Sequence, residues 1–385
     1  MPAGMPVASE FHQARQLTDA LFQVVRPDSL YERPIPERHR ILFYLGHLEA
    51  FDWNLMARHA LELPAFDPTL DRLFAFGIDP VEGDLPDDQP SDWPTAAEVE
   101  RYNHRTRKRI DTVLPHVPEP MLEAAIEHRL MHAETLAYIF HQLPYERKVG
   151  SSVPPAPAPR PVQPGMIEIP AGPAELGLRP GTGFGWDNEY QAHTVEVPAF
   201  SIARYKVTNG DYLEFVRAGG PPPFFWVERR GAWFYRGMFA EMPLPLDWPV
   251  YVTKCQAEEY ARWRGLVLPT EAQFQRAAAG LPPSLNADFR YWDPVPVTAD
   301  DLGANTPTQM SGNGWEWTST VFGPFPGFEP FSFYSNYSAP FFDGQHYVLK
   351  GGSPRTAARL LRPSFRNWFR PSYPYIYATF RMVAS

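Results

Sequence analysis

The sequence predicts a protein of two domains, an all-α four-helix bundle followed by an irregular α+β domain. Apolar residues recur at helical spacing in four stretches of the first half, and a proline-rich segment follows them at 149–165. Beyond that segment the pattern changes to short β-rich runs separated by glycine and proline turns. The length of 385 residues suits two domains of roughly 100–200 residues each. We therefore expect domains at residues 1–148 and 166–385.

The four helical stretches of the first half cover residues 9–25, 37–63, 95–114 and 119–143. Four helices of this length can bury one shared apolar core when they pack as a bundle. Pro94 lies where a first helical turn would begin, and Pro115 lies just past the end of the third stretch. Both positions suit proline at a helix boundary.

The proline-rich segment has its densest part at 151–164, with the sequence SSVPPAPAPRPVQP. Such a run forms neither a helix nor a central strand, so we expect an extended, semi-rigid linker. After it, residues 166–169 and 193–202 have the composition of strands, and residues 256–264 are the one helix that we expect. The second half is thus predicted to contain much irregular loop.

Composition and charge narrow the possible partners. Hydrophobic residues make up 44% of the chain, which is typical of a globular protein. The net charge of -9 argues against a nucleic-acid partner, because phosphate binding needs a basic face. The sequence has no apolar run of about 18 residues and no secretion-signal pattern, so we expect no membrane partner. The single cysteine, Cys255, excludes a disulfide within the chain; we expect a cytoplasmic protein and a packing role for Cys255.

Three histidines form a candidate metal site. His128 and His132 are four residues apart in one predicted helix, so both imidazoles lie on one helix face. His47 lies in a largely apolar helix of the same bundle, and facing helices often build metal sites in a bundle core. Neutral imidazoles suit zinc, copper or ferrous iron, and three ligands leave positions open for catalysis.

The alternative for these histidines is structural, a polar stripe for the pair and a single buried hydrogen bond for His47. The other histidines lack comparable sequence context and are expected to be surface or packing residues. They are His12, His39, His59, His104, His116, His141, His193 and His346.

Ordered motifs of the second half resemble the formylglycine-generating-enzyme fold, which is C-type-lectin-like. Taken singly, each motif reads as a structural turn, because glycine and proline punctuate most of them. The motifs are PLPLDWPV at 243–250, ARWRG at 261–265, LPTEA at 268–272, GNGWEWT at 312–318, GGS at 351–353 and FR at 380–381. Formylglycine generation itself depends on a cysteine pair, so the lone Cys255 argues against that activity.

Two further motifs, GPFPGF at 323–328 and RPSFRNW at 362–368, resemble the sulfoxide synthases of ergothioneine biosynthesis, which join a DinB-like bundle to this fold. The resemblance implies an iron-dependent oxidoreductase that holds Fe(2+) through His47, His128 and His132. It also implies dioxygen as oxidant and hercynine, an N-trimethylated histidine, as first substrate.

The resemblance places hercynine beside Asn367 and Trp368, and an aromatic face suits a trimethylammonium group that cannot donate an ordinary hydrogen bond. Met131 stands where the family usually has a glutamine, so this chain must orient the hercynine imidazole differently. Tyr334 and Tyr337 are candidates by position for an assisting tyrosine, with a purely structural role as the alternative for each.

The second substrate is expected to differ from γ-glutamylcysteine, which family members grip with arginines. The corresponding loop reads EGDLPDDQPSD at 82–92, and the residues after the Asn-Trp pair include Phe369 and Tyr373. Carboxylates would repel an anionic donor but accept hydrogen bonds from hydroxyls. A neutral selenosugar is the preferred donor, as in selenoneine synthases, with Asp84, Asp87 and Asp88 as candidate hydroxyl contacts.

Three alternatives stay open. The acidic loop can be ordinary solvated surface, the donor can be cysteine or another thiol, and the chain can be a binding module that has lost its metal.

Overall fold

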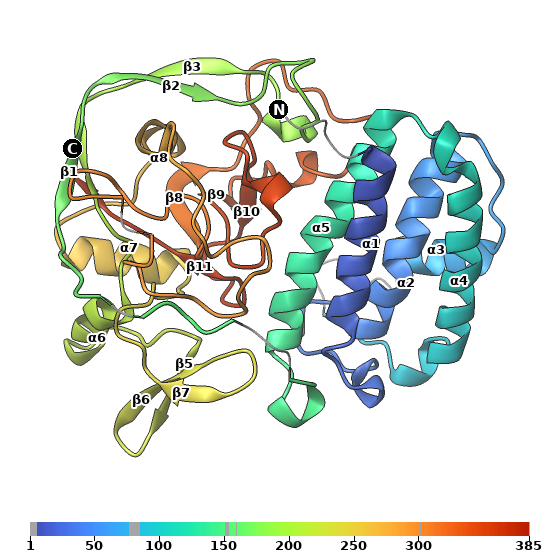
Figure 1. The fold of residues 1–385 in the computed structure, drawn as a ribbon, viewed down its shortest axis with the longest axis horizontal. Helices are drawn as coiled ribbons and strands as arrows, with labels where there is room; N and C mark the ends of the chain where they lie inside the picture. Colours follow the sequence, from blue (N-terminus) through green and yellow to red (C-terminus); the bar gives the residue numbers. More distant parts are fainter. Residues whose placement is uncertain (1–5, 77–84, 151–153, 159, 301, 385) are drawn as a thin grey trace. The chain divides into compact units, whose positions relative to one another are not determined.

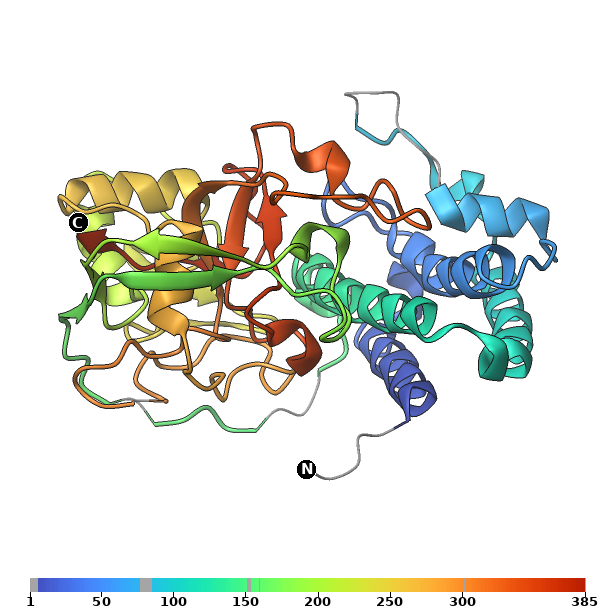
Figure 2. The same cartoon turned by 90° about the horizontal axis from the view of Figure 1, so that it is seen from above.

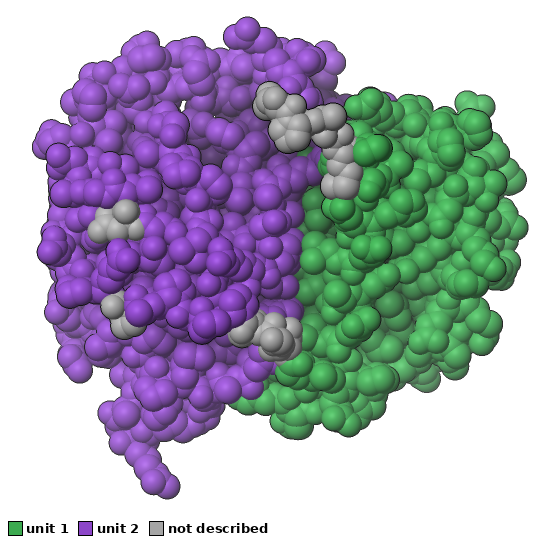
Figure 3. Space-filling view, in the orientation of Figure 1, with its two compact units in different colours: residues 1–151 green, residues 152–385 purple. Residues whose placement is uncertain are grey.

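The computed structural model describes residues 6–76, 85–150, 154–158, 160–300 and 302–384. The chain divides into two compact units, Met1–Ser151 and Ser152–Ser385 (Figure 3). The described residues of the proline-rich segment form neither helix nor strand.

The first unit is the predicted helical bundle. Among its described residues, four long helices form: α1 (Val7–Phe22), α2 (Ile41–Asp52), α4 (Ala96–Val113) and α5 (Glu119–His141). Helix α1 packs against α5, and α2 packs against both α4 and α5 (Figure 1). None of the described helices has the combination of length and apolarity needed to cross a bilayer.

The first unit also departs from the sequence prediction. The stretch expected at 37–63 begins as α2 only at Ile41 and continues from Trp53 as a π-helical segment, η2 (Trp53–His59). A short helix, α3 (Pro68–Phe76), packs against α2 and was not predicted, because its nine residues give a weak periodic signal.

Pro94 precedes the cap of α4 instead of lying in its first turn. The N-cap is Thr95, whose hydroxyl accepts a hydrogen bond from the Glu98 backbone N–H at 3.3 Å. The Glu98 carboxylate accepts the Thr95 backbone N–H in return at 2.8 Å, which completes a capping box. Pro115 lies in a 3-10 turn, η4 (Leu114–His116), that ends α4.

A buried ion-pair network sets the register of α2 against α5. The Arg129 guanidinium is 0% exposed and lies 2.9 Å from a Glu49 carboxylate oxygen and 2.5 Å from an Asp52 carboxylate oxygen. Removing one partner of such a buried network leaves an uncompensated charge, which strongly disfavours any slip of one helix along the other. His47 and His128 lie within two residues of these charges, so the same register holds them opposite each other.

The described residues of the second unit form four small sheets, as expected for an irregular α+β domain. The antiparallel ribbon of β2 (Gly172–Leu176) and β3 (His193–Val197) is prominent in Figure 2. In the first sheet the strand order is β1 (Met166–Ile169), β4 (Phe200–Ala203), β12 (Val383–Ala384), and in the second it is β10 (Asn367–Phe369), β9 (Tyr347–Lys350), β8 (Trp315–Val321), β11 (Ala378–Thr379). The third sheet pairs β2 with β3. The fourth has the order β5 (Trp226–Arg229), β6 (Ala232–Arg236), β7 (Glu241–Pro243). The single strand expected at 193–202 is therefore wrong, because the chain leaves β3 at Pro198 and enters a different sheet as β4.

The second unit has more helix than the sequence analysis expected. Helix α7 (Lys254–Trp263) matches the predicted helix, but α6 (Asn209–Arg217) and α8 (Glu271–Ala278) were missed. Both begin with a capping box, Thr208 with Asp211 and Thr270 with Gln273. That spacing of three residues was visible in the sequence and marks a helix start.

The GNGWEWT motif has a structural role. Glu316 is buried between Arg381, with bonds of 2.6 and 2.9 Å, and Lys206, at 3.2 Å. Lys206 also donates to the carbonyl oxygens of Gly312 and Gly314. The motif thus joins β8 to the C-terminal residues and to the chain after β4.

Cys255 is exposed, which corrects the expected packing role. It lies in the first turn of α7, whose inward face is formed by Ala257, Tyr260 and Ala261.

Candidate active site

The first unit brings His47, His128 and His132 together. Helix α2 supplies His47, and successive turns of α5 supply the other two. One nitrogen from each ring forms a group whose members all lie within 4.8 Å of one another. Three nitrogens bound to one ion at about 2.1 Å lie about 3.0–3.6 Å apart, so the rings would move closer by at most about 1–2 Å to share an ion.

A hydrogen bond determines which nitrogen of His47 is available. The Nδ1 atom lies 2.7 Å from the carbonyl oxygen of Phe74. Because a carbonyl oxygen only accepts, Nδ1 carries the proton and Nε2 keeps its lone pair. A backbone partner of this kind is typical of metal-binding histidines.

Burial keeps the three imidazoles neutral. Desolvation lowers the pKa of His47 to about 4, although the bond to Phe74 opposes the shift. Desolvation also lowers the pKa of His128 and of His132 well below the usual value, with neighbouring positive groups adding to the effect. Neutral rings offer lone pairs to a cation at pH 7.

The chemistry of this cluster fits a transition-metal ion. The buried Nδ1 atom of His132 has no hydrogen-bond partner among the described residues. A buried polar atom without a partner costs free energy unless a ligand satisfies it. Within the part of the chain that the structure describes, no other group of three His, Cys, Asp or Glu side chains comes this close together.

Aromatic rings shield the cluster on its α2 side. Phe43 stacks on His47 with ring centroids 4.9 Å apart, and Phe51 stacks on His128 at 3.4 Å. Phe43, His47 and Phe51 are spaced by four residues, so they share one face of α2. The apolar shell excludes water and lowers the local dielectric around any bound cation.

In the second unit, Trp368 lies in an aromatic cluster. It stacks on Phe322 at 4.3 Å and 6°, meets Tyr337 edge-on at 5.4 Å, and lies 5.6 Å from Phe341. We call these four residues the Trp368 cluster. Pairing of Trp368 with Val348 of β9 fixes its backbone. The Asn367 side-chain oxygen accepts the Trp368 backbone N–H at 2.9 Å.

The segment that carries both candidate tyrosines is held by residues that the sequence analysis did not single out. Asp187 lies in a 3-10 turn, η6 (Asp187–Glu189), and accepts a hydrogen bond from the Ser338 hydroxyl at 2.6 Å. Trp186 stacks on Tyr337 at 4.1 Å. Tyr337 is 8% exposed, and burial raises the pKa of Tyr334. The sequence GWDNEY at 185–190 groups a tryptophan with acidic residues, which was the available signal.

The acidic loop does not fulfil its predicted role at Asp88. That carboxylate is buried and pairs with Arg33 and Arg40, and it accepts the indole N–H of Trp93 at 2.6 Å. Burial raises the pKa of Asp88, but the Trp93 bond and the arginines outweigh it and hold the pKa below the usual value. Asp88 therefore stabilises the fold rather than contacting a donor.

The other predicted donor and substrate residues have different surroundings. Asp87 is exposed, and Asp84 lies outside the described residues. Phe369 stacks on Tyr373 at 5.3 Å and 11°, and both are half-buried. Met131 is half-buried on α5 beside His132.

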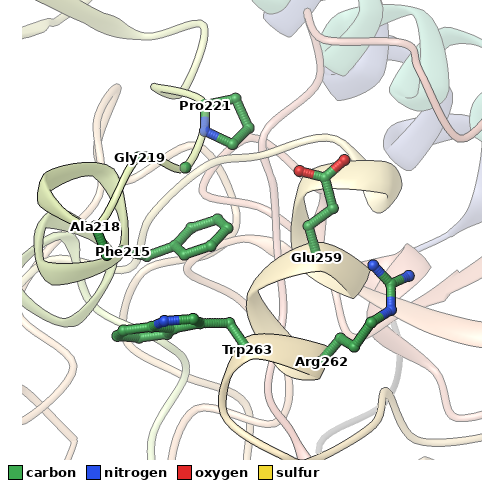
Figure 4. Close-up of a pocket in the computed structure, with 8 residues that line it drawn as sticks. Phe215, Ala218, Gly219, Pro221, Glu259, Arg262 and Trp263 are labelled. Carbon is green, nitrogen blue, oxygen red and sulfur yellow. The ribbon is translucent and has the colours of Figure 1, made fainter.

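A surface pocket of about 410 Å³ lies between α6 and α7, and none of the residues that line it is a predicted site residue (Figure 4). Its walls include Phe215, Trp263, Glu259 and Arg262. None of these side chains belongs to the histidine cluster or the Trp368 cluster.

Comparison with known proteins defines the class of this chain. Residues 10–144 match the DinB superfamily, and residues 152–305 and 307–385 match the sulfatase-modifying factor enzyme 1-like domain. The chain is 35% identical to hercynine oxygenase of Mycolicibacterium smegmatis, over 71% of this chain and 74% of the relative. It is 31% identical to hercynine oxygenase of Mycolicibacterium thermoresistibile, over 99% and 96%. Ergothioneine biosynthesis protein 1 of Schizosaccharomyces pombe is 28% identical, over 94% of this chain and 54% of that protein.

These matches confirm a helical DinB-type domain followed by a domain of the formylglycine-generating type. The chain belongs to the hercynine oxygenase family and is an enzyme.

Proposed function

We propose that this enzyme uses dioxygen to join the imidazole carbon of hercynine to a sulfur or selenium donor, with Fe(2+) held by His47, His128 and His132. The observation that carries the proposal is the cluster of three neutral imidazoles, whose ligand atoms lie within 4.8 Å of one another. The names of the relatives support hercynine as the substrate. Ferrous iron, when bound, supplies the one-electron chemistry that dioxygen requires.

The reaction balances with dioxygen as the sole oxidant. The hercynine C–H and the donor S–H or Se–H each lose a hydrogen, and a carbon–chalcogen bond forms. One oxygen atom stays on the chalcogen as the oxide, and the other leaves as water with the two hydrogens. Two electrons come from bond formation and two from oxidation of the chalcogen, so one dioxygen molecule is fully reduced.

The second unit is proposed to bind hercynine through the Trp368 cluster. A trimethylammonium group is attracted to an aromatic face by roughly 0.5–2 kcal/mol, and the cluster provides several such faces. Asn367 offers an amide beside it, and either Tyr334 or Tyr337 would donate a hydrogen bond or proton to the reacting groups. Met131, beside His132, is proposed as a further substrate contact.

For the donor we propose a neutral selenosugar. The half-buried, stacked rings of Phe369 and Tyr373 suit the C–H face of a sugar. Arg33 and Arg40 both pair with Asp88, which offsets one of their two positive charges and occupies N–H donors of both guanidinium groups. They are therefore less suited to grip a donor carboxylate. Asp87 remains a candidate contact for sugar hydroxyls, and Asp84 is proposed for the same role on its sequence position alone. The alternative is a free thiol such as cysteine.

One competition assay tests both the reaction with hercynine and the identity of the donor. The iron-reconstituted enzyme would receive hercynine and oxygen with equal concentrations of selenosugar, thiosugar, cysteine and γ-glutamylcysteine, and the products would be identified by mass. We expect hercynine consumption with a preference for the selenosugar. A preference for cysteine would reject the sugar donor only. No hercynine product with any donor would reject the proposed function.

A further inference from the structure

Gly46, the residue before His47, lies against the ring of Phe74. A Cβ atom added at Gly46 would lie 2.5 Å from two atoms of that ring and 2.6 Å from a third. Contacts this short do not occur between real side chains, so the ring occupies the space that any larger residue would need. Phe74 is 0% exposed and packs closely against α2 only because position 46 has no side chain.

The same Phe74 supplies the carbonyl oxygen that accepts the His47 Nδ1–H at 2.7 Å. Phe74 lies in α3, which packs against α2, the helix of His47. The position of its carbonyl oxygen relative to His47 therefore depends on how closely the two helices approach.

Helix α3 is also anchored through Asp71, which lies three residues before Phe74 and so on the same helix face. The Tyr102 hydroxyl of α4 donates to an Asp71 carboxylate oxygen at 2.9 Å, and the Asn54 side chain donates to the Asp71 carbonyl at 3.2 Å. Displacement of the Phe74 ring by a side chain at position 46 would act against these bonds. The strain would fall on the contact between Phe74 and His47.

Helix propensity makes glycine the costly choice at this position. Gly46 lies in the interior of α2, where glycine is about 1 kcal/mol less favourable than alanine. Alanine would stabilise α2 if space allowed it, so the glycine is explained by the Phe74 contact.

We propose that Gly46 is a positioning residue for the metal site. The absence of a side chain at Gly46 leaves room for the Phe74 ring, so the Phe74 carbonyl oxygen can accept the His47 Nδ1–H. That hydrogen bond holds the His47 imidazole in the tautomer whose Nε2 lone pair faces the cluster. The inference rests on the proposed metal site. It adds that the glycine at position 46 determines which tautomer His47 adopts.

The test compares Gly46→Ala with Gly150→Ala, a matched control in the same unit whose added Cβ would meet nothing within 4 Å. Metal affinity would be measured with cobalt(II) and anaerobic iron(II) against a chelator. The tautomer of His47 would be read from the imidazole nitrogen resonances of the metal-free protein. We expect Gly46→Ala to bind metal about 10- to 100-fold more weakly and to show a mixed His47 tautomer, with the control like wild type.

The double variant Gly46→Ala/Phe74→Leu provides the rescue, because leucine removes the ring and keeps the carbonyl. It should restore the Nδ1–H tautomer and most of the metal affinity, even if Gly46→Ala alone fails to fold. A folded double variant with a mixed tautomer would overturn the inference, as would a Gly46→Ala protein indistinguishable from wild type. If wild type itself binds neither metal, the proposed function fails instead.

Discussion

Each histidine of the cluster is kept uncharged by burial, and His47 is also oriented by a backbone partner. The spacing of His128 and His132 was sufficient to predict that they share a helix face, because four residues make about one turn. The contact of His47 with Phe74 was not predictable, because α3 itself gave too weak a signal. Helical spacing and the apolar context of His47 thus predicted the three candidate ligands, while the backbone partner of His47 required the packed structure.

His132→Ala tests the metal ligands. Loss of one of three ligands should abolish tight binding, lowering metal affinity by more than about 100-fold, while the helical circular dichroism changes little. Titration with cobalt(II) measures the affinity. His104→Ala, an exposed position on α4, should bind metal like wild type. Equal affinities of the two variants would contradict the assignment.

Trp368→Leu tests the aromatic site. Removal of the aromatic face should weaken hercynine binding by about 2- to 30-fold, the equivalent of roughly 0.5–2 kcal/mol. Trp368→Phe should recover part of the affinity, because a phenyl ring keeps a smaller face. Calorimetry with hercynine measures the effect, and Trp263→Leu, at the exposed pocket of Figure 4, serves as the control. A normal affinity in Trp368→Leu would place hercynine elsewhere.

Among the elements, long helices were predicted well and short ones poorly. Helices α4 and α5 match their predicted stretches to within two residues at each end, since many turns repeat the same apolar face. Helices α6 and α8 have only nine and eight residues, so their capping boxes were the better signal. Strands of two to five residues within loops, such as β11, depend on tertiary partners that no local pattern reveals.

The turn that contains Asp187 should fix the position of the segment that carries Tyr334 and Tyr337. Asp187→Ala removes the acceptor for the Ser338 hydroxyl, so Tyr334 and Tyr337 lose a fixed position; kcat should fall by up to about 100-fold with a smaller change in KM. Asp187→Asn keeps an acceptor oxygen and should retain most of the activity. Steady-state kinetics with saturating donor measure the split. An equal loss of kcat in both variants would indicate that the negative charge of Asp187 matters, and not its hydrogen bond with Ser338.

The buried lysine beside the GNGWEWT motif should give stability an alkaline dependence. Burial lowers the pKa of Lys206 to about 8, against 10.5 for an exposed lysine, although Glu316 opposes the shift. Between these values the unfolded chain binds more protons than the folded one, so the free energy of unfolding should rise from pH 8 to 10. The slope is at most about 1.4 kcal/mol per pH unit for each such lysine.

Urea unfolding at each pH measures this slope. Lys350, whose pKa burial also lowers to about 8, should contribute in the same direction. Lys206→Met should therefore reduce the slope by about half. A stability that does not rise over this range in wild type, and a slope that Lys206→Met leaves unchanged, would contradict the lowered lysine pKa.

For the whole molecule, the two units carry different parts of the proposed chemistry. All three candidate metal ligands belong to the first unit, and the Trp368 cluster belongs to the second. The proline-rich segment and the change of periodicity made the fold class predictable. The assignment of iron and hercynine depended on resemblance, because imidazole ligands alone suit several metals.

Hydrogen exchange on the full chain can follow this division. Metal alone should protect the backbone amides of α2 and α5, since it links them through their histidines. Hercynine should protect peptides that contain Tyr337 and Trp368. Mass spectrometry of the exchanged peptides measures both effects. Protection of only the helical unit by hercynine would contradict the proposed role of the second unit.

The exposure of Cys255 has a practical consequence. Because it is the only cysteine of the chain and lies on the outer side of α7, a nitroxide reagent can modify the wild-type protein at one defined place. With a paramagnetic ion bound at the histidines, the magnetic coupling between the ion and the nitroxide would measure the distance between a point in the first unit and a point in the second. A change in that distance as substrate is added would report movement of one unit relative to the other, without any engineered mutation.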